Sequence, residues 1–257
     1  MMSDVIYNLV MGLLQGLTEW IPVSSSGHLV LAQHSFDVQE RTLFDAILHL
    51  GTLFAALVYF RKDLKVLLNL KNPLTHKIII ASIPIIIVGL LLSDVIEAAF
   101  ELALVVSVLL IINGCMLMVN AFLKQKNSGN NQNENNELST KTAIMIGLFQ
   151  IFALFPGISR SGTTITTGRV LGINWSLAAK FSFFISFIPL AGAAGFKIIT
   201  AYNEFNVTYV VGFVVAFLVG YATIDIMMRV LRLGKFHYFG VYTIILGIAM
   251  IGILLFY

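Results

Sequence analysis

Long apolar stretches restrict this sequence to very few folds. Hydrophobic residues make up 58% of its 257 residues and charged residues only 11%, against about 25% charged residues in ordinary soluble domains. A soluble globule of this size would lack the polar side chains needed to cover so much apolar mass. We therefore expect an all-α polytopic membrane protein, since helices satisfy their backbone hydrogen bonds within the hydrocarbon. A net charge of +3 is too small to indicate a nucleic-acid partner.

A helix needs about 20 mostly apolar residues to cross the hydrocarbon. Six stretches meet this requirement and are predicted to be transmembrane helices: 43–60, 76–93, 102–123, 177–200, 207–228 and 238–257. Two further apolar regions, 5–34 and 142–172, are interrupted midway by polar clusters that contain Pro and Gly. Their arms are too short for two crossings, so each region is predicted to be a re-entrant helical hairpin. Irregular backbone is tolerated at membrane depth only inside protein or beside a wet cavity, so the two breaks predict a cavity.

The two interrupted regions match each other in sequence. An ungapped alignment at an offset of 135 residues pairs Gly12 with Gly147, Gln15 with Gln150, Ser24 with Ser159, Ser26 with Ser161, and Gly27 with Gly162. Each half of the chain then has one hairpin and three crossings. The odd number of crossings inverts the second half relative to the first, as in many transporters. We predict two inverted repeats, 1–123 and 142–257.

The basic residues predict the orientation in the membrane. Three connections hold eleven of the 16 Lys and Arg residues, namely Arg61, Lys62, Lys65, Lys71, Lys77, Lys124, Lys126, Lys141, Arg229, Arg232 and Lys235. The alternate connections carry acidic residues and no Lys or Arg. Because Lys and Arg concentrate on the cytoplasmic side, these three connections, including the polar linker 124–141, are predicted to be cytoplasmic. The first hairpin then opens outward and the second inward, and their tips meet near the midplane.

The first tip, QGLTEWIPVSSSGH, combines an acid with serines and a histidine. Gln15 and Glu19 lie four residues apart on one helical face, and a carboxylate at this depth is costly and rarely idle. After the break at Pro22 come Ser24, Ser25, Ser26, Gly27 and His28. Taken singly, each serine is explained as a common helix cap, and packing explains His28 as well as a functional role does. Their joint occurrence at a forced turn predicts a functional site.

The second tip, FPGISRSGTT, adds a positive charge. After the break at Pro156 and Gly157, polar residues open the next helix: Ser159, Arg160, Ser161, Thr163 and Thr164. An arginine at a buried turn needs a counter-charge, which Glu19 and a bound anion can supply. Helix N-termini, hydroxyls and a guanidinium together bind phosphate, and two N-termini at one point fit a ligand with two phosphates. A purely structural Arg–Glu pair is the alternative.

Two weaker pairs stand on the predicted spans. Asp45 and His49 share a face of the first span, where they either border the cavity or cap the interface. Asp225 and Arg229 have the spacing of a helical ion pair near the inner surface.

The two tip motifs resemble those of the undecaprenyl-diphosphate phosphatases, an integral-membrane family known for bacitracin resistance. A Glu or Gln followed by x-x-x-Glu and P-V-S-S-x-G-H matches residues 15–28, and P-G-x-S-R-S-x-x-T matches residues 156–164. The resemblance covers essentially the whole chain. It departs at Gln15, where many members carry Glu, and a neutral amide weakens any site in which two carboxylates hold a metal.

This resemblance implies hydrolysis of a C55 polyprenyl (undecaprenyl) diphosphate to the monophosphate that carries peptidoglycan and other envelope precursors. It also implies a plasma-membrane location, a site open to the outer face and a divalent cation, Mg²⁺ or Ca²⁺, held by Glu19 with diphosphate oxygens. The expected catalytic residues are Glu19, Ser25, His28 and Arg160. The expected substrate-binding residues are Gln15, Ser24, Ser26, Gly27, Ser159, Ser161 and Thr164.

The attacking atom and two other functions stay open at this point. Ser25, with His28 or Glu19 as its base, ranks first as nucleophile, ahead of a water activated by the same pair. His28 could instead attack directly or protonate the leaving phosphate. An acid-phosphatase-type lipid phosphatase needs a histidine six residues after its arginine, where this chain has Thr166. A polyprenyl-phosphate transporter or flippase fits the inverted repeat equally well, although the acid, serine, histidine and arginine exceed what anion binding requires. The sequence leaves the lipid chain length and the oligomeric state open.

Overall fold

The computed structural model describes residues 2–36, 42–123, 138–232 and 235–256, and its regular elements are helices throughout. Most of the predicted linker 124–141 lies outside the described residues. The first half contains α1 (Met2–Thr18), α2 (Ser25–Ser35), α3 (Thr42–Tyr59), α4 (Arg61–Leu67), α5 (Pro73–Leu91), α6 (Ser93–Phe100) and α7 (Ala103–Phe122). The second half contains α8 (Thr140–Phe149), the 3-10 helix η1 (Gln150–Leu154), α9 (Arg160–Val170), α10 (Trp175–Thr200), the 3-10 helix η2 (Tyr202–Glu204), α11 (Tyr209–Arg232) and α12 (Tyr238–Phe256).

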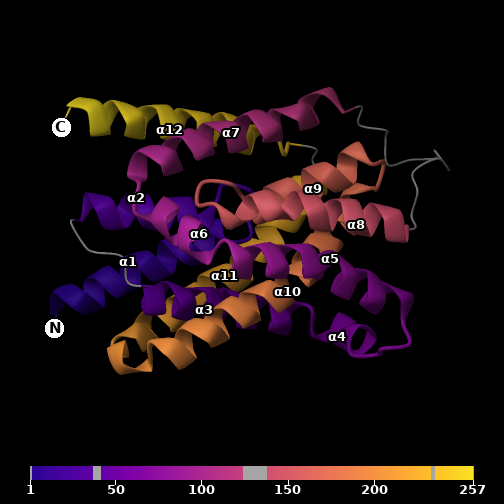
Figure 1. Cartoon of the computed structure of the whole chain (residues 1–257), viewed down its shortest axis with the longest axis horizontal. Helices are drawn as coiled ribbons and strands as arrows, with labels where there is room; N and C mark the ends of the chain where they lie inside the picture. The colour runs from indigo at the N-terminus through magenta and orange to yellow at the C-terminus, as the bar shows by residue number, and fades with distance from the viewer. Residues whose placement is uncertain (1, 37–41, 124–137, 233–234, 257) are drawn as a thin grey trace.

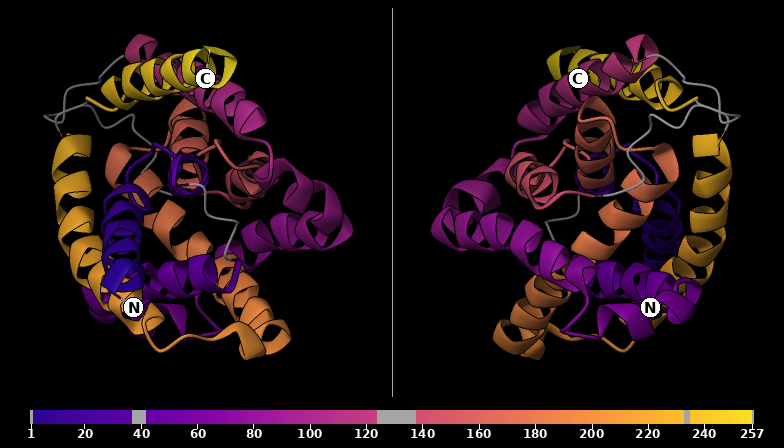
Figure 2. Two further views of the ribbon diagram at one scale, coloured as in Figure 1. Left: turned by 90° about the vertical axis from the view of Figure 1, so that its left-hand side faces the viewer. Right: turned by 90° about the vertical axis from the view of Figure 1, so that its right-hand side faces the viewer.

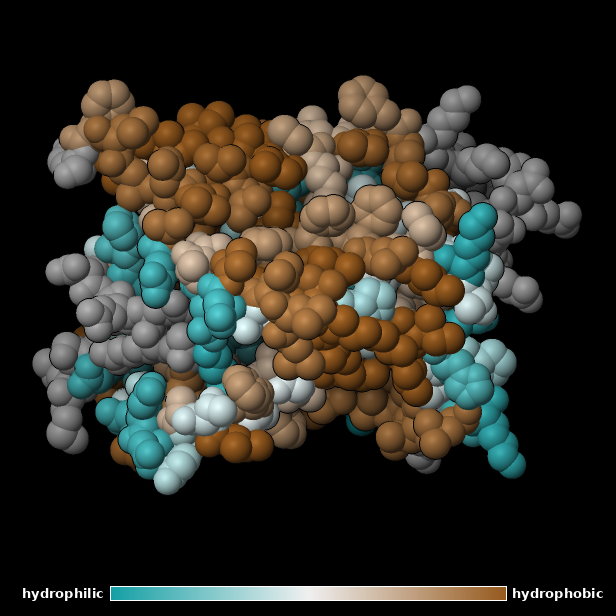
Figure 3. Space-filling view, in the orientation of Figure 1, coloured by the Kyte–Doolittle hydropathy of each residue, from teal (hydrophilic) through white to brown (hydrophobic). Residues whose placement is uncertain are grey.

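The lengths and apolar compositions of the helices are those of a polytopic membrane protein. Five helices, α5, α7, α10, α11 and α12, are long and apolar enough to cross a membrane. The predicted span 43–60 is the exception among the six, because its apolar helix, Leu43–Tyr59, is shorter. The short helices α4 and α6 were not predicted, since each lies in a connection and is far below the length of a span. Hydrophobic side chains cover the middle of the molecule, and hydrophilic ones gather at its two ends (Figure 3).

The two interrupted regions form hairpins that approach from opposite ends of the molecule. Helix α1 packs against α2, and α8 with η1 packs against α9. Figure 1 shows the turn of each hairpin near the centre, with α1 and α2 on the side of the N-terminus and α8 and α9 on the other side. The longer helices surround these turns (Figure 2). The fold thereby brings two non-helical turns, far apart in sequence, into its interior.

Candidate active site

The first hairpin turns through a constrained segment. Ser24 has a φ of +67°, which is uncommon for a residue other than glycine. Its Oγ accepts a hydrogen bond from the backbone N–H of Gly27 at 3.2 Å and so caps the N-terminus of α2. Ser25, the first residue of α2, therefore projects from a fixed helix end.

The second hairpin repeats this capping. The Oγ of Ser159 accepts from the N–H of Gly162 at 3.0 Å, and Arg160 is the first residue of α9. The turn before it contains Gly157, whose φ is +107°, and a Cβ there would lie 2.7 Å from the carbonyl oxygen of Val106. Only glycine fits this backbone beside α7.

The two turns contact each other directly. The Oγ of Ser24 also accepts from the N–H of Gly157 at 3.1 Å. Asn113 of α7, fully buried, donates from Nδ2 to the carbonyl oxygen of Pro22 at 3.2 Å and accepts at Oδ1 from the N–H of Ser159 at 2.9 Å. One amide therefore fastens both turns. The sequence analysis missed Asn113, although an amide inside the predicted span 102–123 is the kind of costly residue that marks a function.

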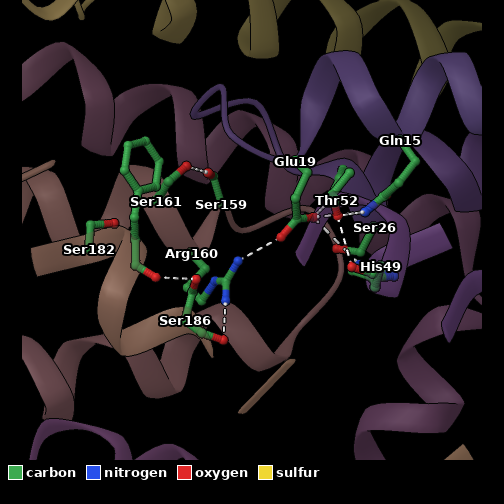
Figure 4. A network of polar contacts seen from close by, with 12 residues as sticks. Gln15, Glu19, Ser26, His49, Thr52, Ser159, Arg160, Ser161, Ser182 and Ser186 are labelled. Carbon is green, nitrogen blue, oxygen red and sulfur yellow. Dashed lines mark hydrogen bonds and ion pairs between the residues drawn. The ribbon is translucent and has the colours of Figure 1, made fainter. Parts of the chain in front are cut away.

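Glu19 is the centre of the polar network (Figure 4). Its Oε1 accepts from Nη2 of Arg160 at 2.6 Å, and its Oε2 accepts from Oγ of Ser25 at 2.5 Å and from Nε2 of Gln15 at 3.0 Å. Nε2 of His49 lies 3.6 Å from the same Oε2. The Glu19 side chain is only 4% exposed. The structure thus joins the first hairpin to the second through the ion pair that the sequence predicted.

Arg160 is held from two sides. Besides Glu19, it contacts α10 by donating from Nη1 to the carbonyl oxygen of Ser186 at 3.2 Å. Its side chain is 14% exposed. Ser25 and Arg160, the first residues of α2 and α9, both contact Glu19, so the two helix N-termini and the guanidinium lie close together. The first backbone N–H groups of a helix have no acceptor within the helix, and helix N-termini with a guanidinium are the parts of an anion site.

His28 has different partners from those expected. Its Nδ1 lies 2.8 Å from the carbonyl oxygen of Ser24, and its Nε2 lies 2.8 Å from the hydroxyl of Tyr242 on α12. Because a carbonyl only accepts, Nδ1 is the donor. Within the described part of the chain, no hydrogen bond joins His28 to Glu19 or Arg160. The sequence contained no signal that distinguished Tyr242 from the other aromatic residues of the spans.

The remaining predicted binding residues mostly hold the tips. Ser26 lies 3.3 Å from Ser24, and Ser161 lies 3.2 Å from Ser159, oxygen to oxygen. Thr164 donates to the carbonyl oxygen of Arg160 at 2.8 Å, and its hydroxyl lies 2.6 Å from that of Ser182 on α10. Gly27 packs against Gly157. These contacts orient Ser25 and Arg160.

The two weaker pairs have different outcomes in the structure. His49 borders the Glu19 network, whereas Asp45 accepts hydrogen bonds from Gln33 at 2.9 and 3.0 Å. The predicted helical pair is confirmed, with Arg229 and Asp225 2.5 Å apart.

Protein ligands for a divalent cation are few. No group of three or more His, Cys, Asp and Glu side chains that could hold a metal lies among the described residues. Both oxygens of Glu19 already accept hydrogen bonds. Gln15 adds one buried oxygen, Oε1, that has no hydrogen-bond partner. This donor set fits only a cation whose other ligands come from a bound diphosphate.

Comparisons with known proteins identify the family of this chain. Residues 8–249 match the family described as bacitracin resistance protein BacA. A relative from Methanobrevibacter smithii, named undecaprenyl-diphosphatase, is 36% identical over 271 residues, which cover 95% of this chain and 96% of the relative. Proteins of the same name from Bacteroides fragilis and Carboxydothermus hydrogenoformans are 37% and 38% identical, and each comparison covers at least 95% of both chains. The chain therefore belongs to the BacA family of bacitracin resistance proteins.

Proposed function

We propose that this protein is an undecaprenyl-diphosphatase, which hydrolyses undecaprenyl diphosphate to the monophosphate and inorganic phosphate. Family membership and the names of the relatives support the substrate. One observation carries the assignment of the site: Glu19 contacts both Ser25 of the first hairpin and Arg160 of the second. The carboxylate of Glu19 thus joins Ser25, the candidate nucleophile, to the guanidinium of Arg160, which would hold the phosphate.

The geometry supports a two-step reaction. Glu19 takes the proton of the Ser25 hydroxyl, and Oγ of Ser25 attacks the terminal phosphorus while the bond to the bridging oxygen breaks. Arg160 and the N–H groups of α2 and α9 stabilise the charge on the transferred phosphoryl group. Before the second step Glu19 gives up its proton to solvent. Water then attacks the phosphoserine, the bond between phosphorus and Oγ of Ser25 breaks, and Glu19 takes a proton from the water and passes it to Oγ. Lipid monophosphate leaves in the first step and inorganic phosphate in the second.

We assign His28 to the lipid-phosphate side of the site. His28 lies three residues after Ser25 on α2, so both side chains share a helix face. Tyr242 already contacts Nε2 of His28, whereas Ser25 contacts its base directly at 2.5 Å. This difference favours Ser25 as nucleophile and leaves His28 to hold or protonate the departing monophosphate.

We propose that the divalent cation, Mg²⁺ or Ca²⁺, binds together with the substrate. Glu19 and the free Oε1 of Gln15 would hold it beside the diphosphate oxygens. Such an ion neutralises charge on the diphosphate when bound.

The proposed topology is two inverted repeats, 1–123 and 142–257, each with one re-entrant hairpin and three spans. Helix positions support it: adding 135 to the bounds of α2, 25–35, gives 160–170, which are the bounds of α9. The same addition to α7, 103–122, gives 238–257, beside the observed α12. The packing also follows the repeat. In the two repeats α1 corresponds to α8, and α5 corresponds to α11. Helix α1 contacts α11, and in the same way α8 contacts α5.

The proposed location is the plasma membrane, with the basic connections and the linker 124–141 in the cytoplasm and the site open to the outer face. The Lys and Arg distribution supports this orientation. In that position the enzyme would return the lipid carrier to peptidoglycan synthesis and confer bacitracin resistance.

A polyprenyl-phosphate flippase without hydrolysis is the second candidate, favoured by hairpins that approach from opposite ends. The 2.5 Å contact between Ser25 and Glu19 favours hydrolysis, because transport requires no activated hydroxyl.

Phosphate release from undecaprenyl diphosphate by the purified protein in detergent tests the proposal. The wild type should release phosphate, and Arg160→Ala should abolish release. The control, Arg229→Ala, removes an arginine from an exposed pair and should keep wild-type release. A wild type that binds the lipid without turnover would favour the flippase.

A further inference from the structure

His49 lies in the Glu19 network but has no part in the reaction described above. It comes from α3, and its Nε2 lies 3.6 Å from Oε2 of Glu19. This distance is too long for a formed hydrogen bond. The His49 side chain is 22% exposed, compared with 4% for Glu19. His49 therefore lies between the buried carboxylate and the surface.

The backbone fixes the orientation of the imidazole. Nδ1 of His49 lies 2.7 Å from the carbonyl oxygen of Asp45, and because a carbonyl only accepts, Nδ1 carries a proton. In the neutral ring Nε2 then presents its lone pair to Oε2 of Glu19. Two acceptors facing each other attract only when a proton lies between them.

The neighbours of Glu19 leave one acceptor for such a proton. Arg160 on Oε1 and the amide nitrogen of Gln15 on Oε2 are donors only. Ser25 on Oε2 is the source of the proton. Of the groups described around the carboxylate, Nε2 of His49 is thus the one with a lone pair ready to accept.

We propose that His49 relays the proton that Glu19 takes from Ser25. The O–H bond on Oε2 of Glu19 breaks, an N–H bond forms on Nε2 of His49, and the imidazole becomes an imidazolium. Glu19 returns to the carboxylate that pairs with Arg160 and can accept the proton of the attacking water. The N–H bond on Nε2 then breaks, and His49 gives that proton to water, which the 22% exposure of its side chain admits. This relay rests on the proposed hydrolysis, and His49 acts through Glu19 without contacting the substrate.

Chemical rescue tests the relay. His49→Ala and His49→Gln are purified beside the wild type, and phosphate release from undecaprenyl diphosphate is measured with and without added imidazole. We expect kcat to fall about 10²-fold in both variants, at the low end of general acid–base effects, with KM within twofold of wild type. Added imidazole should raise the kcat of His49→Ala toward the wild-type value in a saturable manner, and more basic imidazoles should raise it further. His49→Gln, whose side chain fills the space, should not respond.

His34→Ala, on the exposed end of α2, is the matched control and should show neither the loss nor the response to imidazole. Wild-type kcat in either His49 variant would overturn the relay. So would a loss in His49→Ala that imidazole fails to reduce, because a structural loss is not repaired by a free base. An inactive wild type would instead count against the proposed hydrolysis itself.

Discussion

The ion pair between Glu19 and Arg160 predicts strong coupling in the free energy of unfolding. The change is Arg160→Ala and Glu19→Gln, made singly and together. The pair is 2.6 Å long and the Glu19 side chain is 4% exposed. Removing one partner of a buried pair costs about 3–5 kcal/mol, because the other charge stays buried without compensation.

The double variant carries neither charge, so its cost should not exceed that of one single variant. Independent effects would add to about 6–10 kcal/mol, and we therefore expect a coupling of at least about 3 kcal/mol. Arg160→Ala should be the more costly single variant by about 1 kcal/mol, because it also loses the hydrogen bond to Ser186.

Reversible unfolding in mixed micelles with rising SDS measures these values. Trp20 is a suitable fluorescent probe, since its ring is buried against Phe183 with centroids 5.2 Å apart. The matched cycle on Asp225 and Arg229, side chains 46% and 75% exposed, should give a coupling below about 0.5 kcal/mol. Additivity within about 0.5 kcal/mol at Glu19 and Arg160 would refute the reasoning.

Four further substitutions, of which Gly172→Ala is a control, test how the tips are held, by the same unfolding measurement. Gly157→Ala should cost about 2–5 kcal/mol, because its φ and the contact at 2.7 Å both oppose a Cβ. Gly172→Ala, at a φ of +86° with open space around it, should cost only about 1–2 kcal/mol, and equal costs would contradict this explanation. Ser24→Ala should cost about 1–2 kcal/mol, because it loses the hydrogen bonds that Oγ accepts from Gly27 and Gly157. A cost near zero would contradict a stabilising role for these two hydrogen bonds. Asn113→Leu leaves backbone groups of both turns unpaired and should cost about 2–5 kcal/mol, with kcat for phosphate release falling as well, and an unchanged kcat would show that the turns hold their positions without it.

Polar residues inside apolar stretches made the site's core predictable. A carboxylate and an arginine at membrane depth are each too costly to stand alone, so Glu19 and Arg160 had to meet if the hairpins converged. The repeat offset likewise paired Ser24 with Ser159, and the structure gives both the same capping role. The predicted helices agree with the observed ones to within a few residues.

The faces of the spans were not predictable. In a membrane protein the lipid-facing and buried sides of a helix are equally apolar, so no period in the sequence marks the inner face. Tyr242 contacts His28 because of how α12 packs, which the sequence does not encode locally. Asn113 stood out as an amide inside an apolar span, but its contacts with both turns follow from how α7 packs. For the same reason the role of His49 stayed open and His28 was grouped with Glu19 instead of Tyr242.

Labelling the enzyme with phosphate tests the central claim that the two tips form one catalytic site. Undecaprenyl diphosphate with a labelled terminal phosphate is mixed with the protein, the reaction is stopped with denaturant at neutral pH, where phosphoserine and phosphohistidine both persist, and the labelled peptide is identified. We predict label on Ser25 in the wild type and at least about a 10²-fold slower labelling of Ser25 in Arg160→Ala, although Ser25 itself is unchanged there. Labelling of Ser25 at the wild-type rate in Arg160→Ala, or label on His28, would contradict the account.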